Sequence, residues 1–294
     1  MSFRDELLIS GILGETGEPG LYHRSGLFED VVSGVERYFR SLNPVDNIRW
    51  TMSPVTTTQA LVDTDYVDSF PQLMALLDGF NGDARQARVL AESAHAGADW
   101  SGYLGTTNLA LRPVACHGLY PTLSGREVPD GGAQFEVSAT CFRREPSDDP
   151  ARMQSFRMLE FVMVGTPSEC RVFRDEWLHR ALAAHRALGL DVSSQVANDP
   201  FFGRASQMLS QGQIEKELKY EVMALIASEE PNAISSANYH EDHFGNSFNI
   251  TTPSGVAHSA CFGVGLERTT LALFRRHGLR VSHWPSGIMD LLGI

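Results

Sequence analysis

The chain has 294 residues, 43% of them hydrophobic and 20% charged, an ordinary balance for a globular protein that excludes wholesale disorder. Its formal net charge is −12, from 24 basic and 36 acidic residues, and its only lysines are Lys216 and Lys219. An acidic chain needs a local basic stripe to overcome phosphate repulsion, so a large RNA is a disfavoured partner.

No apolar run in the chain approaches the roughly 20 residues that cross a bilayer. The N-terminal stretch MSFRDELLISGILGETGEPG has early acidic residues and only a short apolar segment, unlike a secretory signal, so we expect a cytoplasmic protein. Disulfides are rare in that compartment, and the four cysteines include no CxxC pair. Cys141 and Cys170 are therefore expected to pack as small apolar side chains.

The N-terminal part of the chain contains a predicted helix followed by a strand. Residues 26–42 place apolar side chains at helical spacing. The next residues, NPVDN, break the helix, and IRWTMSP alternates like a strand that stops at Pro54. This pattern fits both an α/β packing unit and a dimer interface, and periodicity does not decide between them.

Three later segments, residues 107–116, 134–145 and 156–165, are rich in strand-forming residues and predict strands. The polar stretch PSDDPARMQS separates the last two, which together predict an antiparallel hairpin with a long tip. Loops of this length on a rigid pair of strands often carry functional residues.

The remaining segments alternate between helical and irregular patterns. Residues 168–190 predict a helix, and 191–213 predict an irregular connector. Residues 214–226 fit either a helix or a strand, while 245–255 predict a strand that ends in a turn. The stretch SACFGVGLERTTLALF, residues 259–274, predicts a turn that leads into a helix.

Charged and aromatic side chains follow the same face of the predicted hairpin. Arg143 shares a face with Glu145, and on the return strand Phe156 shares a face with Glu160. An arginine can hold a phosphate through two hydrogen bonds and a ring can stack on a base, so this face is typical of a nucleotide site. For a single strand, a solvated face with an ion pair explains the same residues.

The stretch GVGLER adds a second possible anion site. Gly263 and Gly265 permit a tight turn, and Arg268 falls in the first turn of the predicted helix, where the N-terminus favours anions. A lone GxG is weak evidence, and a solvated arginine beside a closely packed turn is the alternative explanation.

Taken in order, these motifs resemble those of a known family. FRRE, FRMLEF and GVGLER resemble the second and third signature motifs of class II aminoacyl-tRNA synthetases, and the helix and strand ending at Pro54 resemble the first, which builds the dimer in that family. The resemblance implies an α+β fold, in which helices flank an antiparallel β-sheet. It also implies one catalytic domain over residues 1–294, with a helical insertion near 168–215.

Four stretches are more similar to one subfamily, the amino acid:[carrier protein] ligases: VACHGLYP, NDPFFGR, NYHEDHFG and HSACFGVGLER. Those enzymes are relatives of an atypical zinc-dependent seryl-tRNA synthetase, but they lack its tRNA-binding domain. They activate a small amino acid with ATP and transfer it to the phosphopantetheine thiol of a carrier protein. The resemblance therefore implies a homodimeric, AMP-forming ligase with no tRNA partner.

The resemblance also implies a zinc ion held by Cys116, Glu160 and Cys261. Three protein ligands leave a fourth position open, which is the pattern of a working rather than a structural zinc site. That position would take the α-amino group of the amino acid and so orient its carboxylate. Taken singly, each cysteine is still explained by burial as a small apolar side chain.

Carried over in the same way, two catalytic arginines are implied: Arg143 would hold the α-phosphate and the reacting carboxylate, and Arg268 the γ-phosphate. The other implied ATP-binding residues are Glu145, Arg152, Met153, Phe156, Lys219, Ala233, Ile234, Ser235 and Ser236. Ala233 departs from the seryl-synthetase pattern, which has a magnesium-binding glutamate there. Mg²⁺ is still implied, and its candidate substitute ligands are Ser235, Ser236 and Glu230 or Glu241.

Carrier proteins are usually acidic, so docking of one requires a basic patch. The candidates lie on the helix predicted at 168–190, although a solvated helix face explains them equally well. They are Arg171, Arg174, Arg180 and Arg186. Two other functions fit the motifs: a synthetase-like enzyme that recruits its tRNA-binding part in trans, and a non-catalytic paralogue that senses an amino acid or a nucleotide.

Overall fold

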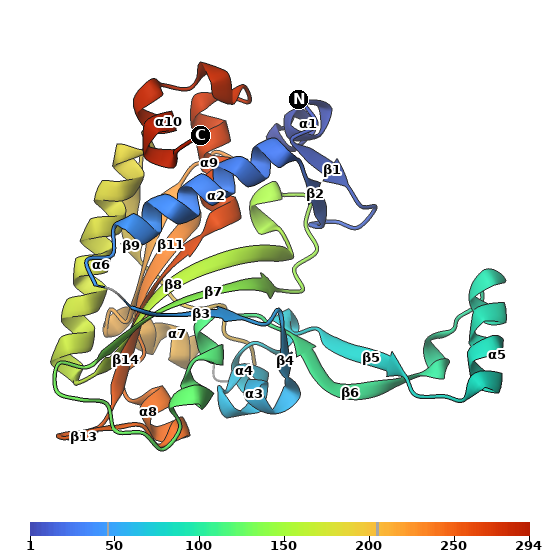
Figure 1. Cartoon of the computed structure of the whole chain (residues 1–294), viewed down its shortest axis with the longest axis horizontal. Helices are drawn as coiled ribbons and strands as arrows, with labels where there is room; N and C mark the ends of the chain where they lie inside the picture. Colours follow the sequence, from blue (N-terminus) through green and yellow to red (C-terminus); the bar gives the residue numbers. More distant parts are fainter. Residues whose placement is uncertain (46, 204–205) are drawn as a thin grey trace.

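The computed structural model describes residues 1–45, 47–203 and 206–294 (Figure 1). Arg204, the last residue of the stretch NDPFFGR, lies outside the described residues. The centre of the fold is a seven-stranded sheet in which every neighbouring pair is antiparallel except β3 and β7. In spatial order its strands are β3 (Ile48–Met52), β7 (Ala133–Phe142), β8 (Ser155–Gly165), β14 (His258–Gly265), β11 (Asn232–Tyr239), β10 (Lys219–Ala224) and β9 (Ser193–Val196).

Three long helices cover one face of this sheet: α2 (Gly26–Ser41), α6 (Pro167–Ala187) and α9 (Leu266–His277) (Figure 1). The Trp177 ring of α6 stacks between Phe161 of β8 and Phe262 of β14, with centroid distances of 4.1 and 5.0 Å. Because side chains alternate across a strand, residues of the other parity face away from the helices. The expected α+β fold, an antiparallel sheet flanked by helices, is confirmed.

Smaller elements surround the sheet. A second, three-stranded sheet has the order β4–β6–β5, and in Figure 1 β5 and β6 extend away from the body toward α5. No residue of α5 is buried. The remaining elements are α1 (Phe3–Ile9), β1 (Leu13–Glu15), β2 (Tyr22–Arg24), β4 (Val55–Thr57), α3 (Thr58–Asp63), α4 (Tyr66–Ser69), β5 (Leu76–Phe80), α5 (Ala84–His95), β6 (Leu104–Leu111), α7 (Ser206–Glu215), α8 (His243–Phe248), β12 (Thr251–Thr252), β13 (Gly255–Val256) and α10 (Ser286–Leu292).

Several local predictions differ from the structure. The segment 191–213 is not an irregular connector, because β9 pairs with β10 and α7 begins at Ser206. The strand expected to reach Cys116 ends at Leu111, two residues before Pro113, and Cys116 begins a short 3₁₀ helix (Cys116–Gly118). The expected strand at 245–255 begins instead as the end of helix α8, and only the short strand β12 and the first residue of β13 are extended. None of the helices in the described part of the chain is long and apolar enough to span a membrane.

A buried ion network joins the start of α2, strand β8 and the start of α9. The Glu267 carboxylate, 1% exposed, accepts hydrogen bonds from the backbone N–H of Arg157 (2.6 Å) and from its Nε (2.7 Å). Arg24 donates a further hydrogen bond to Glu267 at 2.9 Å, and Arg157 also pairs with Glu29 at 2.6 Å. The network fixes the first turn of α9, which carries Arg268 next to Glu267.

Glu267→Gln should lower the free energy of unfolding by about 2 kcal/mol, because it removes the buried anion of Arg24 and Arg157 and leaves them only the part-exposed Glu29. Glu15→Gln is the matched control: it removes an exposed partner of Arg4 and should cost less than about 1 kcal/mol. Urea unfolding at neutral pH measures both changes. Equal losses in the two variants would contradict a structural role for the network.

His185 of α6 is fully buried against the sheet, where its Nε2 lies 3.1 Å from the Ser235 hydroxyl. Burial lowers the pKa of His185 to about 3, against about 6.5 in an unfolded chain. Below pH 6.5 the unfolded chain therefore takes up a proton that the folded chain does not, and stability falls as the pH falls. His185→Gln should remove up to about 1.4 kcal/mol per pH unit of this dependence between pH 6 and pH 4. Urea unfolding at several pH values tests this, and identical pH slopes in wild type and variant would contradict it.

Candidate active site

The face of the sheet opposite the three helices collects the candidate functional residues. Cross-strand register places Val137 of β7 and Gly263 of β14 opposite Glu160. The side chains of Val137 and Glu160 therefore share one face, where Gly263 adds no side chain. Cys261 lies two residues from Gly263 and is therefore a diagonal neighbour of Glu160 on that face. The same register puts Phe156 on the face of Glu160, as the strand parity predicted.

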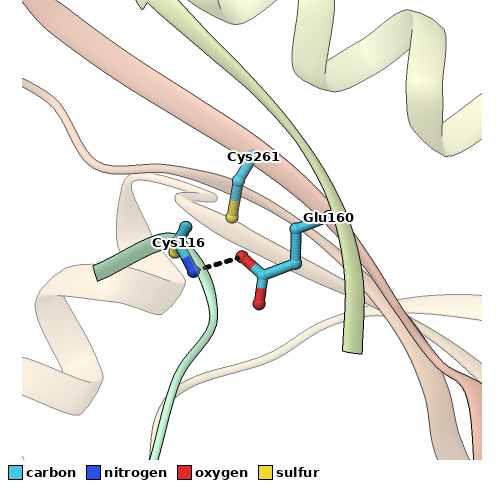
Figure 2. Close-up of side chains that lie close together, drawn as sticks. All are labelled: Cys116, Glu160 and Cys261. Atoms are coloured by element: carbon cyan, nitrogen blue, oxygen red, sulfur yellow. Dashed lines mark hydrogen bonds between the residues drawn. The ribbon is translucent and has the colours of Figure 1, made fainter. Parts of the chain in front are cut away.

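The predicted metal ligands converge on this face, although they come from three separate segments (Figure 2). One ligand atom from each of Cys116, Glu160 and Cys261 lies within 4.8 Å of the other two, and all three residues are buried. The backbone N–H of Cys116 donates a hydrogen bond to Glu160 at 3.2 Å, which links the 3₁₀ turn to the sheet. The cluster has the composition and closeness of a metal site.

The electrostatics of the cluster favour a bound cation. Burial, together with the nearby Cys261 sulfur, raises the pKa of Glu160 to about 7. A hydrogen bond between the two thiols lowers the pKa of Cys261 and raises that of Cys116, so one sulfur carries the charge at the other's expense. Two sulfurs and a carboxylate cannot all ionise here without a neighbouring positive charge. Thiolate and carboxylate ligands of this number fit Zn²⁺ with one position left free.

Two arginines, one at the end of β7 and one at the start of α9, lie close enough to act on each other's charge. Arg143 directly follows β7, donates from Nε to the Pro113 carbonyl at 3.1 Å and lies over the Phe156 ring at 5.3 Å. Arg268 donates from Nε to the Ala151 carbonyl at 2.7 Å and from Nη1 to the Ala233 carbonyl at 3.1 Å. Its Nη2 takes part in neither bond. Burial and the like charge of Arg143 lower the pKa of Arg268. Two guanidinium groups brought together in this way favour an anion between them.

The loop between β7 and β8 closes over one side of this arginine pair. Met153 and Phe156 line a small pocket together with Arg268 and Glu267. Arg152, in a 3₁₀ turn (Pro150–Arg152), is exposed, and the Glu145 carboxylate is close enough to Arg268 to act on its charge. The structure therefore gathers Arg143, Met153, Phe156 and Arg268, and leaves Arg152 at the rim.

Lys219 lies on the same face but is already paired with acids. Its Nζ is 2.6 Å from Asp199 and 3.2 Å from Glu221. Burial alone would lower the pKa of Lys219, but these two carboxylates outweigh it and raise the pKa. Asp199 also accepts a hydrogen bond from Gln213 of α7 at 2.9 Å, so α7 is tied to the sheet through this pair.

The segment Ala233–Ser236 is divided between the two faces of β11. Ser236 pairs across from Glu221 and Gly263, on the face of the metal cluster. Ser235 has the opposite parity and bonds His185 under α6, and Ile234 is buried in the helix-side core. Ser235 and Ile234 therefore cannot offer their side chains to a nucleotide, whereas the Ala233 carbonyl orients Arg268. The candidate magnesium ligand Glu241 forms an ion pair with Lys216 at 2.9 Å.

The four arginines of α6 do not form one continuous patch. Arg174 is buried; it donates to the carbonyl of Glu217 at 2.5 Å and lies over the Tyr220 ring, so it anchors α6 to β10 rather than facing a partner. Arg171 and Arg186 are exposed, and Arg180 is half-buried over Trp177. Only these three remain candidates for a docking surface.

Comparisons with known proteins show the family of this chain. The chain is 38% identical over 281 residues to amino acid–[acyl-carrier-protein] ligase 1 of Bradyrhizobium diazoefficiens, and 39% identical over 290 residues to ligase 2 of the same organism. The alignments cover 95% and 98% of this chain, and 86% and 87% of the two relatives. The chain belongs to the amino acid–[acyl-carrier-protein] ligase family.

More distant matches agree with the fold of this ligase. The type-2 serine–tRNA ligase of Methanopyrus kandleri is 27% identical over 195 residues, which cover 61% of this chain and 37% of that enzyme. A crystal structure of M. kandleri seryl-tRNA synthetase with Aquifex aeolicus tRNASec superposes with a TM-score of 0.83 at 18% identity, over 99% of this chain and 60% of that one. No family model matches the sequence.

Four residues of the ligase site were missed by sequence reasoning. Glu221 and Asn238 lie on the face of the metal cluster, and the alternation around Lys219 was the available signal for Glu221. Asp199 and His240 lie in the stretches NDPFFGR and NYHEDHFG, which carried the family resemblance but gave these two residues no role. Their partners Lys219 and Cys261 are about 20 residues away in the chain, so local spacing did not indicate the contacts.

Proposed function

We propose that this chain activates a small amino acid with ATP and transfers it to the phosphopantetheine thiol of a carrier protein, releasing AMP. The supporting observations are the Cys116–Glu160–Cys261 cluster on the open face of the sheet and the approach of Arg268, at the start of α9, to Arg143, at the end of β7, in a member of this ligase family. We further propose that residues 1–294 act as one catalytic unit, in the cytoplasm and without tRNA.

In the first step, a carboxylate oxygen of the amino acid attacks the α-phosphorus of ATP, and the bond to pyrophosphate breaks. Arg143 would hold the α-phosphate and the carboxylate, and Arg268 the γ-phosphate, because both are fixed by carbonyl hydrogen bonds before substrate arrives. Negative charge that builds up on the phosphoryl oxygens is offset by these preorganised donors. Phe156 would stack on the adenine ring, and Met153 and Arg152 would cover the nucleotide.

The amino acid would be oriented at the metal cluster. Cys116, Glu160 and Cys261 would hold Zn²⁺, and the bound ion supplies a Lewis-acid site for the α-amino group. Fixing the amine and the carboxylate at two points places the attacking oxygen and removes much of the entropic cost of the reaction. Glu221 and Ser236 face the same space and are our candidates for Mg²⁺ ligands.

In the second step, the phosphopantetheine sulfur attacks the carbonyl carbon of the adenylate. A carbon–sulfur bond forms, the bond to the AMP oxygen breaks, and the thiol proton is lost to solvent. The adenylate is already activated, so no covalent enzyme intermediate is required.

We also propose a homodimer built on α2 and β3. Strand β3 forms one edge of the main sheet, and its Ile48 and Trp50 are 61% and 44% exposed on the same side of the strand. Two large apolar side chains next to each other on an edge strand favour a covering partner, and a second copy of this chain provides one.

The decisive experiment is ATP–pyrophosphate exchange with a panel of amino acids, followed by transfer assays. Exchange with glycine, alanine or serine, and transfer to a holo-carrier protein but not to tRNA, is the expected result. A folded protein that shows no exchange with any amino acid would be a sensor rather than a ligase. Transfer to tRNA alone would make it a synthetase-like enzyme.

Charge reversal on α6 should separate the two steps. Arg171→Glu combined with Arg180→Glu should slow transfer to an acidic carrier about tenfold through slower association, while amino-acid-dependent exchange stays unchanged. Arg85→Glu with Arg88→Glu on α5 makes the same charge change elsewhere and is the matched control. Unchanged transfer in the α6 variant would rule this surface out, and transfer rates at two salt concentrations provide the measurement.

A further inference from the structure

The sulfur of Cys261 has two polar neighbours in addition to the other metal ligands. The Nδ2 of Asn238, the residue directly opposite on β11, donates a hydrogen bond to it at 3.3 Å. The Nε2 of His240 lies 3.5 Å from the same sulfur. A buried thiolate is stabilised most by neighbours that donate hydrogen bonds to it. Whether His240 stabilises the Cys261 thiolate therefore depends on whether its Nε2 carries a proton.

The other nitrogen of the imidazole faces two hydroxyl groups. Nδ1 of His240 lies 2.9 Å from the Ser259 hydroxyl and 3.4 Å from the Tyr120 hydroxyl. A hydroxyl has a proton to donate to Nδ1, whereas a thiolate has none. The arrangement is therefore satisfied when Nδ1 accepts and Nε2–H points at Cys261.

His240 is not placed as a fourth ligand. The group of ligand atoms that lie within 4.8 Å of one another contains Cys116, Glu160 and Cys261, and among the described residues no histidine nitrogen joins it. The imidazole therefore contacts one sulfur from outside the cluster and leaves the open position to the substrate. Ser259 is two residues before Cys261 on β14, so the strand that carries the ligand also holds the ring that supports it.

We propose that His240 is a positioning residue of the metal centre, which donates a hydrogen bond from Nε2–H to the Cys261 thiolate and so sets its orientation and its affinity for zinc. Ser259 and Tyr120 fix the required tautomer. This inference rests on the proposed function, because it assumes that zinc occupies the cluster. Partners of this kind around a metal ligand typically contribute about 10–100-fold to metal affinity.

The test compares zinc affinities by competition with a chromophoric chelator at one pH. His240→Phe keeps the ring volume but removes the donor, and we expect zinc binding about 10–100-fold weaker. His240→Gln places an amide N–H near the position of Nε2 and should restore most of the affinity. His258→Gln, at the start of β14 and bonded to Tyr239, is the matched control and should bind zinc like the wild type.

A second readout separates positioning from a general loss of structure. In the cobalt-substituted protein, removal of a hydrogen bond to sulfur should move the thiolate-to-cobalt charge-transfer band to lower energy in His240→Phe but not in His258→Gln. His240→Ala replaces His240→Phe if the latter does not fold. Wild-type zinc affinity and an unshifted band in a folded His240 variant would overturn this inference alone. Failure of the wild type itself to bind zinc would overturn the proposed metal centre as well.

Discussion

Cys261→Ser should reduce amino-acid-dependent ATP–pyrophosphate exchange by about 10²–10³-fold while the protein remains folded. A serine hydroxyl does not ionise near neutral pH, so the proposed Zn²⁺ would lose one of its three ligands, and the amino acid would lose the point proposed to orient its carboxylate. The loss should appear in kcat as well as in KM, since a misplaced nucleophile slows the chemical step itself.

Cys170→Ser is the control for this variant. Cys170 is equally buried, but it lies on α6 on the opposite side of the sheet, where its thiol faces the carbonyl of Met163. It should retain exchange activity and bind one zinc per chain. Chelation of the wild type should reproduce the loss, and added zinc should reverse it. Full-speed adenylate formation by metal-free protein would show that the cluster does not serve activation.

Arg143→Ala should lower kcat/KM for exchange by about 10²–10³-fold, which corresponds to about 3–4 kcal/mol of transition-state stabilisation. Its guanidinium is held by the Pro113 carbonyl and the Phe156 ring, so it is fixed in place before any substrate binds. Arg143→Lys should recover little of this loss, because a lysine has neither the planar fork nor the stacking surface.

The neighbouring arginine provides the control. Arg144 has the opposite parity and is exposed, and it contributes a backbone hydrogen bond to Leu73 that an alanine keeps. Arg144→Ala should therefore exchange pyrophosphate at close to the wild-type rate. Similar losses in both variants would mean that the arginines act through the net charge of the loop rather than through a defined phosphate contact.

The sequence predicted the parts of the site that follow from strand parity and from quoted motifs. Phe156 and Glu160 share a face because the strand period is two, and Cys261 joins them once β14 is paired with β8. The place of Cys116 was not predictable in this way, since its approach to Glu160 depends on how the chain turns after Pro113. The family motif, rather than periodicity, identified it.

Other elements escaped prediction for reasons that the structure explains. β9 and α7 are short and polar, and α7 has no buried residue among those described, so neither shows a clear apolar period. The Asp199–Lys219 ion pair joins the stretch between β9 and α7 to β10. Because its two residues are 20 positions apart in the chain, no local sequence pattern indicates the pair. Ser235 and Ser236 take opposite faces because side chains alternate along β11. The register shift between Val222 and Met223, which leaves Ile234 without a cross-strand partner on β10, has no signal in the local composition.

The diagonal placement of Cys261 and Glu160 on adjacent strands has a consequence for assembly of the fold. If β14 paired with β8 one residue out of step, every side chain of β14 would turn to the opposite face, and the sulfur would point toward α6. If the cluster holds Zn²⁺ as proposed, binding of the ion would stabilise only the chains in which these two strands are paired in the correct register. Protein newly made in a zinc-poor medium would lack this stabilisation of the correct register. We expect it to fold more slowly as well as to lack activity.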